Sequence, residues 1–345
     1  MRWLRCLRPR REEESSLLNQ LMEAYGIAGR EDAVRSVITK ALKQSGVGYY
    51  TDKMGNLHAV RDGAGKQYFL AAYMDEPGII VTKITEDGYL KFDTVGRIDP
   101  AFLVSKRVII GGCCGIISLK AIHLATKAER ETPVRTDQLY IDIGAASAAD
   151  AAECVEIGDY GVLDSRYRTM AHDFVKGRAL AGRMGCFAIL ETLKETNVPV
   201  HAVFAVQREI GCRGMTAAVW QSAADVSIVL DGIADQSPNG KKDTLKAGDG
   251  VVLIWRTGSG SMDASLWNRA ANYAKEHSVP VQYGNLKEKG QEGALMQNGG
   301  GHRCLCLAVP VRYVRSCAQV ASLKDMRSMI ACIKGIIEES ERGLL

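Results

Sequence analysis

The chain has 345 residues, of which 46% are hydrophobic and 24% charged, a composition typical of a globular protein long enough for two domains. The net charge is only +4, and the arginines near the N-terminus are followed at once by Glu12, Glu13 and Glu14, so no nucleic-acid surface is predicted. No apolar run approaches the roughly 20 residues that span a bilayer, and no signal peptide is predicted. The ten cysteines have no regular spacing, so we expect reduced thiols in a cytoplasmic protein.

The first regular pattern is a helix that begins near Leu17 and ends before Gly26, where apolar residues recur at helical spacing. Residues 1–14 are expected to form a loosely ordered head. A second helix is predicted over residues 33–42. Short strands are predicted to follow over residues 49–51, 57–60 and 68–72. The strand over 68–72 is continuously apolar, which is typical of a strand buried on both faces.

The pattern changes after Pro77. Segments 79–84 and 89–95 are predicted to form a hairpin around Asp87 and Gly88. Further short strands are predicted over residues 108–110, 115–118, 139–143 and 158–163. Because few helical patterns interrupt them, we predict a small all-β, barrel-like domain over residues 77–164. It would be inserted into an α/β domain formed by residues 15–76 and 165–345.

Helices and strands alternate again after Gly177. Helices are predicted over residues 184–195, 215–223, 262–277 and 323–338, and strands over residues 200–206, 226–231, 251–255, 279–283 and 304–309. This alternation is typical of an α/β fold with a mixed, largely parallel central sheet flanked by helices. In such sheets functional residues gather at the carboxyl ends of strands, where this chain places Asp75, Glu209, Asp231 and Arg315. By themselves such residues are also typical of caps and salt bridges.

Motifs from about Leu17 to Glu338 carry a resemblance to a known family. They are, in order, DKMGNLHAV, AAYMDEPGIIVTKITEDGYLKFDTVGRIDP, LYIDIGA, VKGRALAGRMG, AVQREIGCRG, VLDG and VPVRYVRS. In these the chain resembles the tetrahedral or glutamyl aminopeptidases, dinuclear zinc or cobalt peptidases of which some members carry an endoglucanase label. The resemblance implies a zinc-exopeptidase-like fold whose β insert serves oligomerisation. It also implies a homo-oligomer, a dimer or dodecamer in the family, or a mixed oligomer with an active paralogue.

The same motifs depart from the family at the metal site. The family has His-Met-Asp at the first strand end, where this chain has Tyr73 in place of the His ligand and keeps Asp75. The Asp that bridges both metals in the family is replaced by Ala181. The general-base Glu of the family is replaced by Arg208, and the ligand after it is kept as Glu209.

Three further positions complete the comparison with the family's site. Asp231 matches a retained metal ligand, whereas the last His ligand is replaced by Arg315. Glu292 keeps a carboxylate in a loop that lies by the active site in the family. Glu209 and Asp231 are therefore the retained ligand positions, and no residue is identified as a catalytic base. We expect no cofactor, with zinc or cobalt only if the site works unexpectedly.

These replacements remove metal and base chemistry together. Two carboxylates without a bridging ligand do not hold a metal pair, and a guanidinium offers no lone pair to a metal or to a proton. The sequence therefore predicts a catalytically degenerate aminopeptidase homologue that serves as a structural, regulatory or ligand-binding protein. We predict that Arg208 and Arg315 replace the charge of the metals by pairing with the retained carboxylates Glu209 and Asp231, and with Asp75.

Several alternatives remain open from the sequence. The favoured interpretation is an ion-pair plug that keeps the old site folded. A sharper alternative is a metal-free, anion-binding enzyme in which the Arg208 and Arg315 pair grips a carboxylate or phosphate beside the Tyr73 hydroxyl. Another is an active aminopeptidase or hydrolase with a reduced or relocated metal site. Peptides and small anions are the ligands that these alternatives predict.

Overall fold

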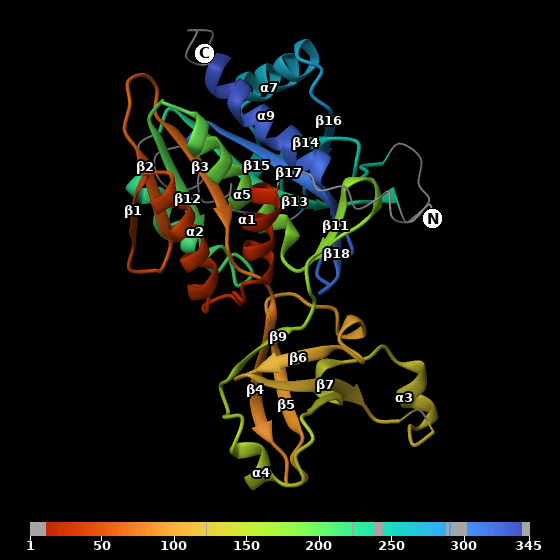
Figure 1. Cartoon of the computed structure of the whole chain (residues 1–345). Helices are drawn as coiled ribbons and strands as arrows, with labels where there is room; N and C mark the ends of the chain where they lie inside the picture. Colours follow the sequence, from red (N-terminus) through yellow and green to blue (C-terminus); the bar gives the residue numbers. More distant parts are fainter. Residues whose placement is uncertain are drawn as a thin grey trace, which may run out of the picture. The chain divides into compact units, whose positions relative to one another are not determined.

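The computed structural model describes residues 12–121, 123–222, 224–237, 244–287, 290 and 302–339. The chain forms two compact units. Unit 1 comprises Met1–Asp75, Arg166–Val314 and Ala318–Leu345, and unit 2 comprises Glu76–Ser165 and Arg315–Cys317. Figure 1 labels most of the helices and strands of the two units.

Unit 1 is built on a mixed 12-stranded sheet. Its strands run in the order β1-β2-β12-β3-β13-β17-β18-β11-β10, and β14 pairs with β17, β15 and β16. The strands are β1 (Gly48–Thr51), β2 (Leu57–Arg61), β3 (Tyr68–Tyr73), β10 (Arg168–Thr169), β11 (Phe174–Gly177), β12 (Val200–Ala205), β13 (Val226–Ala234), β14 (Val251–Thr257), β15 (Gly260–Ser261), β16 (Val281–Asn285), β17 (Cys304–Arg312) and β18 (Gln319–Ser322).

The predicted mixed sheet is confirmed, but it is parallel only in part. Parallel pairs join β12 to β3, β3 to β13, β13 to β17, and β14 to β16. The other pairs are antiparallel. The centre of the sheet is therefore parallel, as expected, and its margins are antiparallel. The reason is that β1 and β2, like β17 and β18, follow each other through short turns, which only antiparallel strands can use.

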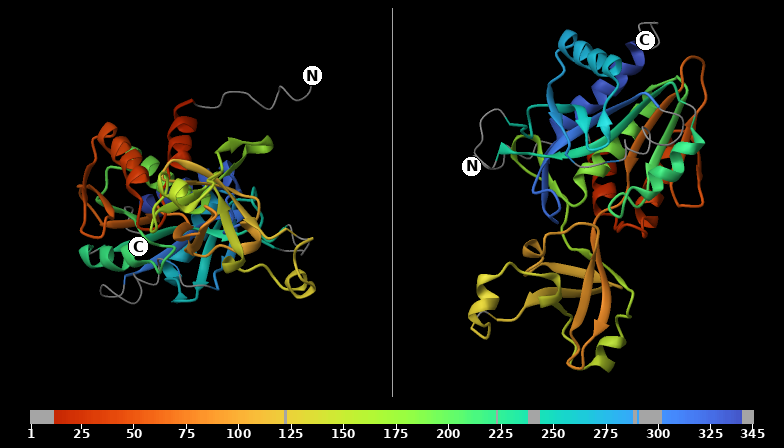
Figure 2. Two further views of the ribbon diagram at one scale, coloured as in Figure 1. Left: turned by 90° about the horizontal axis from the view of Figure 1, so that it is seen from below. Right: turned by 180° about the vertical axis from the view of Figure 1, so that it is seen from behind.

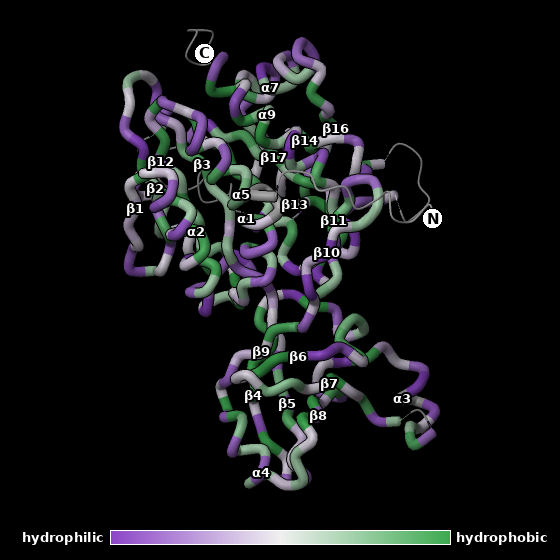
Figure 3. The backbone as a smooth tube through the Cα atoms, in the orientation of Figure 1, coloured by the Kyte–Doolittle hydropathy of each residue, from purple (hydrophilic) through white to green (hydrophobic). Residues whose placement is uncertain are grey.

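Helices pack on both faces of this sheet, as two views of unit 1 show in Figure 2. They are α1 (Glu12–Glu23), α2 (Asp32–Gln44), α5 (Leu180–Glu195), α6 (Arg213–Ala218), α7 (Ala264–Glu276) and α9 (Leu323–Glu339), with 3-10 turns η4 (Ala171–Asp173) and η5 (Val219–Gln221). Every residue of β3 is buried, and its side chains alternate between two apolar clusters. Leu70 and Ala72 join one cluster, whereas Phe69 and Ala71 join the other. The green central strands in Figure 3 reflect this two-sided burial.

Unit 2 is a closed antiparallel barrel in the order β4-β5-β8-β7-β6-β9. Its strands are β4 (Gly78–Ile84), β5 (Leu90–Val95), β6 (Arg107–Ile110), β7 (Cys113–Leu119), β8 (Leu139–Asp142) and β9 (Tyr160–Leu163), with short helices η2 (Pro100–Phe102), α3 (Lys127–Glu131), η3 (Thr136–Gln138) and α4 (Ala148–Ala152). The β4–β5 hairpin confirms the predicted turn at Asp87 and Gly88. Apolar side chains fill the barrel, and Cys317 packs against them. The prediction of a barrel-like all-β element is confirmed.

The loosely ordered head expected over residues 1–14 remains a prediction. Residues 12–14 belong to α1, because this helix begins at Glu12. Residues 1–11 lie outside the described part of the chain. Within that part, no helix combines the length and the apolar composition needed to cross a membrane.

Candidate functional site

The candidate site lies where three adjacent strands of unit 1 end. In the parallel register Ala205 of β12 faces Tyr73 of β3, and Val229 of β13 faces Ala71 of β3. Because side chains two residues apart on a strand share a face, Asp231 lies level with Tyr73. The segment after β12 then brings Arg208 and Glu209 to the same edge of the sheet. This is the edge at which open α/β sheets carry their ligand sites.

Arg208 forms an ion bridge between two carboxylates. Its Nη1 lies 3.0 Å from Oε1 of Glu209, and its Nη2 lies 3.3 Å from Oδ2 of Asp231. Only 1% of the Asp231 side chain is exposed, so this carboxylate has almost no water to neutralise it. The charge of Asp231 raises the pKa of Arg208 well above its usual range, which keeps the guanidinium protonated. The predicted pairing of Arg208 with these carboxylates is thus present.

Asp75 holds the backbone of this segment and does not pair with the guanidinium in the described contacts. Its two carboxyl oxygens accept hydrogen bonds from the backbone N–H groups of Arg208 and Glu209, at 3.0 Å and 2.8 Å. Burial, followed by the charge of Glu209, raises the pKa of Asp75 to about 8. The predicted contact of Asp75 with an arginine therefore involves backbone amide hydrogens, which leaves Arg208 free to bridge the other carboxylates.

Tyr73 packs into space that other residues leave open. The guanidinium of Arg208 lies 4.9 Å from the centroid of the Tyr73 ring, within cation–π range. A Cβ atom at Gly182 would lie 2.5 Å from that ring, so Gly182 makes room for it. Ala181 packs against Gly232, where an added Cβ would come within 2.3 Å of the Ala181 methyl group. Burial, then the charge of Asp231, raises the pKa of Tyr73 and keeps its hydroxyl protonated.

For two predicted site residues, Glu292 and Arg315, a place in this cluster remains a prediction. Glu292 lies outside the described residues. Arg315 belongs to unit 2, where it is exposed and adopts a positive φ of 66°. The structure thus brings together Tyr73, Asp75, Ala181, Arg208, Glu209 and Asp231. The pairing predicted for Arg315 remains a prediction.

The residues of this cluster do not fit a pair of zinc or cobalt ions. The Arg208 guanidinium contacts both Glu209 and Asp231, which the resemblance implies to be ligand positions, and the Ala181 side chain offers no donor atom. Across the described ranges, no group of three or more His, Cys, Asp or Glu side chains is arranged to hold a metal ion. Zinc needs three or four such donors, and a cation would also face the charge of Arg208.

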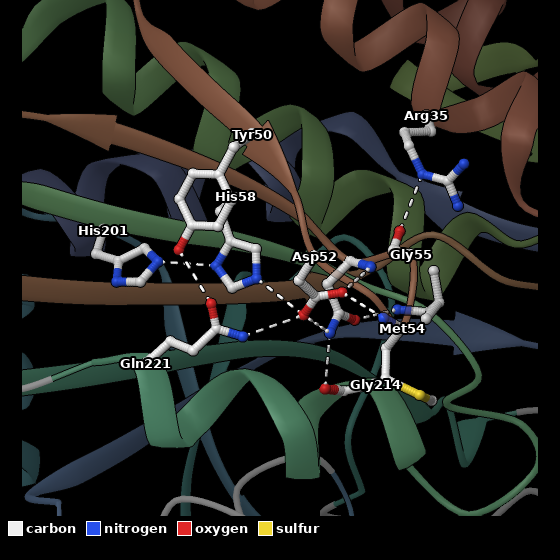
Figure 4. A network of polar contacts seen from close by, with 11 residues as sticks. Arg35, Tyr50, Asp52, Met54, Gly55, His58, His201, Gly214 and Gln221 are labelled. Atoms are coloured by element: carbon white, nitrogen blue, oxygen red, sulfur yellow. Dashed lines mark hydrogen bonds and ion pairs between the residues drawn. The ribbon is translucent and has the colours of Figure 1, made fainter.

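A second polar cluster, which the sequence analysis missed, lies on β1, β2 and β12 (Figure 4). Asp52 Oδ2 lies 3.1 Å from Nε2 of His58, and Nδ1 of His58 lies 2.9 Å from Nε2 of His201. The Tyr50 ring stacks on His58 with ring centroids 4.6 Å apart. Gln221 contacts both the Tyr50 hydroxyl and Asp52.

Only the strand register could have revealed this second cluster. His58 faces Val203 across β2 and β12, so His201, two residues earlier, lies on the same face of the sheet. The two histidines are 143 residues apart in the chain, and neither belongs to a recognised motif of paired ligands. A prediction of which strands pair would have been needed first.

Comparison with known proteins agrees with this architecture. A lysyl aminopeptidase from Pyrococcus furiosus is 27% identical over 94% of this chain and 96% of its own length. The structure of a TET aminopeptidase from a marine sediment thaumarchaeon superposes with a TM-score of 0.91 at 27% identity, over 97% of this chain and all of that one. The Pyrococcus horikoshii TET1 peptidase, which can assemble into a tetrahedron or a large octahedral shell, is 26% identical with a TM-score of 0.84, over 94% and 98%.

The profile described as M42 glutamyl aminopeptidase matches residues 55–332, which include all of unit 2, most of unit 1 and every described residue of the Arg208 cluster. This match covers far more than half of the chain. By sequence, by the inserted barrel and by the strand-end position of its polar cluster, the chain belongs to the M42 glutamyl aminopeptidase family.

Proposed function

We propose that this chain is a catalytically degenerate member of its family, which acts as a structural or regulatory subunit and not as a peptidase. The observation that carries the proposal is the position of Arg208. The resemblance assigns that position to the general base, yet its guanidinium bridges the two retained ligand positions, Glu209 and Asp231. A charged guanidinium neither accepts a proton from water nor binds a metal.

The remaining residues support the same proposal. Buried carboxylates need compensating charge, which two divalent ions supply in a dinuclear site. Here Arg208 supplies positive charge from within the chain, and Tyr73 fills space beside it. An internally compensated cluster of this kind keeps the sheet edge folded without a metal. This is the ion-pair plug that the sequence favoured.

The proposed subunit role requires an assembly. The P. horikoshii relative can assemble into a tetrahedron or a large octahedral shell, and this chain covers 98% of its length. We therefore propose that unit 2 serves oligomerisation, in a homo-oligomer or in a mixed oligomer with an active paralogue. Native mass spectrometry of the purified chain, alone and co-expressed with such a paralogue, would measure this directly. A strictly monomeric chain in both preparations would contradict the subunit role.

Metal content and peptidase activity test the loss of catalysis. We would incubate the protein with excess zinc or cobalt, remove free ions, measure bound metal, and assay a panel of amino-acid anilides. The P. furiosus lysyl aminopeptidase serves as the positive control. We expect no retained metal and no cleavage. One or two tightly bound equivalents with activity would instead support the alternative of a working hydrolase with a reduced or relocated site.

Reversion of the site sharpens this test. The full reversion combines Tyr73→His, Ala181→Asp, Arg208→Glu and Arg315→His. We expect the full reversion to bind zinc and the single change Arg208→Glu to bind none, because a pair of ions needs the bridging carboxylate and the histidines as well. Zinc binding by Arg208→Glu alone would mean that one residue, and not a rebuilt cluster, blocks the metal.

One observation favours anion binding as a second candidate function. The Nε of Arg208 is buried and has no hydrogen-bond partner among the described residues, so one donor of a charged group stays open. A carboxylate or phosphate is the ligand that such a donor suits. Calorimetric titration with inorganic phosphate and with a dipeptide, for the unmodified chain and for Arg208→Lys, tests this candidate. Lysine keeps the charge but lacks the Nε donor, so equal binding by both proteins would contradict it.

A further inference from the structure

The second polar cluster, formed by Asp52, His58 and His201, has a defined pattern of hydrogen-bond donors and acceptors. Burial alone would raise the pKa of Asp52, but hydrogen bonds from Asn56 and His58 together lower it, so this carboxylate is ionised and only accepts. His58 must therefore donate from Nε2 to Asp52. Its Nδ1 then carries a lone pair, which requires His201 to donate from Nε2. While both rings are neutral, the network thus places the hydrogen of each histidine on Nε2.

The same Asp52 carboxylate is connected to the segment over residues 206–214. Its Oδ2 accepts a hydrogen bond of 2.7 Å from Nδ2 of Asn56. That amide also donates to the Gly214 carbonyl at 2.9 Å, and its Oδ1 accepts from the Val206 N–H at 3.0 Å. Asn56 therefore ties together the two ends of the loop that carries Arg208 and Glu209.

Close packing makes this connection specific. A Cβ atom at Gly214 would lie 2.4 Å from Oδ1 of Asn56 and equally close to the Val206 carbonyl. No larger residue fits there without displacing the amide or the backbone. The direction of the Asn56 side chain, which Asp52 sets, therefore determines how both ends of the loop are held.

We propose that Asp52, His58 and His201 form an acid-sensitive brace that positions the segment over residues 206–214, and with it Arg208 and Glu209. The brace accepts one proton without losing a hydrogen bond. His58 then becomes an imidazolium that donates to both Asp52 and His201, while His201 shifts its own hydrogen to Nδ1. A second proton places N–H groups on both sides of the contact between the histidines, so they separate and the brace opens.

The surroundings of the pair support this order of protonation. Burial lowers the pKa of both histidines, and the proximity of His58 adds to the effect at His201, which titrates at about 4. Asp52 favours the charged form of His58 alone. The other titratable groups on this side are Tyr50, stacked on His58, and His302, beyond the ring of Phe69. Gln221 of η5 is neutral.

Nuclear magnetic resonance tests the proton positions. In the full-length protein labelled with ¹⁵N-histidine, we expect His58 and His201 to be the Nε2–H tautomer at neutral pH and His201 to titrate near pH 4. His277, an exposed histidine hydrogen-bonded to the Tyr273 carbonyl, serves as the internal reference. An Nδ1–H tautomer at His58 would overturn the proposal, because that form cannot donate to Asp52 while accepting from His201.

Hydrogen exchange tests the positioning role. Because the open brace binds more protons than the closed one, we expect opening of residues 206–214 to increase as the pH falls from 6.5 to 4, by up to about tenfold per pH unit for each extra proton bound. His201→Gln keeps a neutral donor towards His58 and should remove most of this pH dependence. Asn56→Ala should expose the segment at every pH. Amides of α9 report global unfolding, and the readout needs no enzymatic activity.

Two outcomes would overturn the proposal at this level. One is the same pH dependence in His201→Gln as in the unmodified chain, since the titrating group would then lie elsewhere. The other is exchange of residues 206–214 that follows α9 at every pH, since the segment would then open only when the whole unit unfolds. Neither outcome bears on peptidase activity, so the brace and the proposed function can fail separately.

Discussion

The Arg208 cluster and the Asp52 brace are two polar clusters of the same unit that satisfy their buried groups in different ways. The Arg208 cluster gathers full charges of both signs, with the guanidinium between Glu209 and Asp231. The brace holds one carboxylate against neutral imidazoles. Removing a partner from the first cluster leaves a buried charge without compensation, whereas adding a proton to the second cluster places a new charge on an imidazole. The first should therefore respond strongly to the loss of a partner side chain, and the second to protons added at acid pH.

The largest expected effect is that of Arg208→Met. This change leaves Glu209 and the buried Asp231 without their cation, and we expect it to lower the free energy of unfolding by about 3 kcal/mol. The value lies at the low end for buried pairs because 26% of the Arg208 side chain is exposed. Urea denaturation measures it. Arg303→Met is the matched control, since Arg303 pairs with Asp263 at the surface and should cost under about 1 kcal/mol. Equal losses in both variants would mean that Arg208 does not neutralise the site.

The next effect concerns the room that Gly182 leaves for Tyr73. Gly182→Ala should cost about 2 kcal/mol in unfolding free energy, because its methyl group would overlap the Tyr73 ring. Tyr73→Ala in the same chain should relieve only part of this cost, since the Tyr73 carbonyl also lies 2.6 Å from the added atom. Gly177→Ala, where the nearest atom is 3.4 Å away, is the control and should be nearly neutral. If a double-mutant cycle shows no coupling energy between Gly182→Ala and Tyr73→Ala, the two side chains do not compete for the same space.

The third prediction contrasts the pH dependence of stability in the two clusters. The pKa of Asp75 is raised to about 8, so the folded state holds a proton that the unfolded chain releases above its ordinary value of 3.8. Its contribution to stability is therefore lost as the pH rises towards 8. His201 titrates near 4 against an ordinary 6.5, so its contribution is lost as the pH falls through that window. For each of these two groups, the unfolding free energy changes by at most about 1.4 kcal/mol per pH unit.

Variants separate the two slopes. Unfolding free energies of Asp75→Asn between pH 5 and 8 should lose the alkaline decline, although the variant is less stable throughout because an amide cannot accept from both backbone N–H groups. His201→Gln should retain the alkaline decline and lose the acid one. If either variant removed both the acid and the alkaline decline in unfolding free energy, the two clusters would not be independent.

The smallest effect is expected for Tyr50→Phe. This change removes only the partly exposed hydroxyl contact with Gln221, 3.2 Å long, and should cost about 0.5 kcal/mol. The phenyl ring still stacks on His58, so the titration of that histidine should not change. A shift of the His58 pKa in this variant would indicate that the tyrosine hydroxyl takes part in the brace.

What the sequence predicts well here depends on short-range signals. The apolar run in β3 and the alternation after Gly177 predict the strand ends, and the strand ends place Asp231 and Arg208 together. The helix expected over residues 215–223 is instead the short α6 followed by the 3-10 turn η5, because neighbouring loops fix its ends. Strand β18 went unpredicted, since four residues carry too little periodicity.

Longer-range features of the site did not follow from the sequence. The resemblance identified the replaced positions Tyr73, Ala181 and Arg208, but not that Tyr73 needs a glycine at 182. That dependence is a matter of atomic volume between β3 and α5. The contact between His58 and His201 likewise requires knowing that β2 pairs with β12. Register and packing are properties of the folded sheet, so a linear pattern does not reveal them.

The closed barrel of unit 2 has a consequence for how it can be recognised. Every strand from β4 to β9 has a paired neighbour on both sides, so no strand of the barrel is an edge strand. A partner of this unit cannot add a strand to it. Recognition must then be encoded in side chains and connecting loops, which change quickly under mutation. Related chains can therefore keep the same barrel fold and still bind different partner proteins.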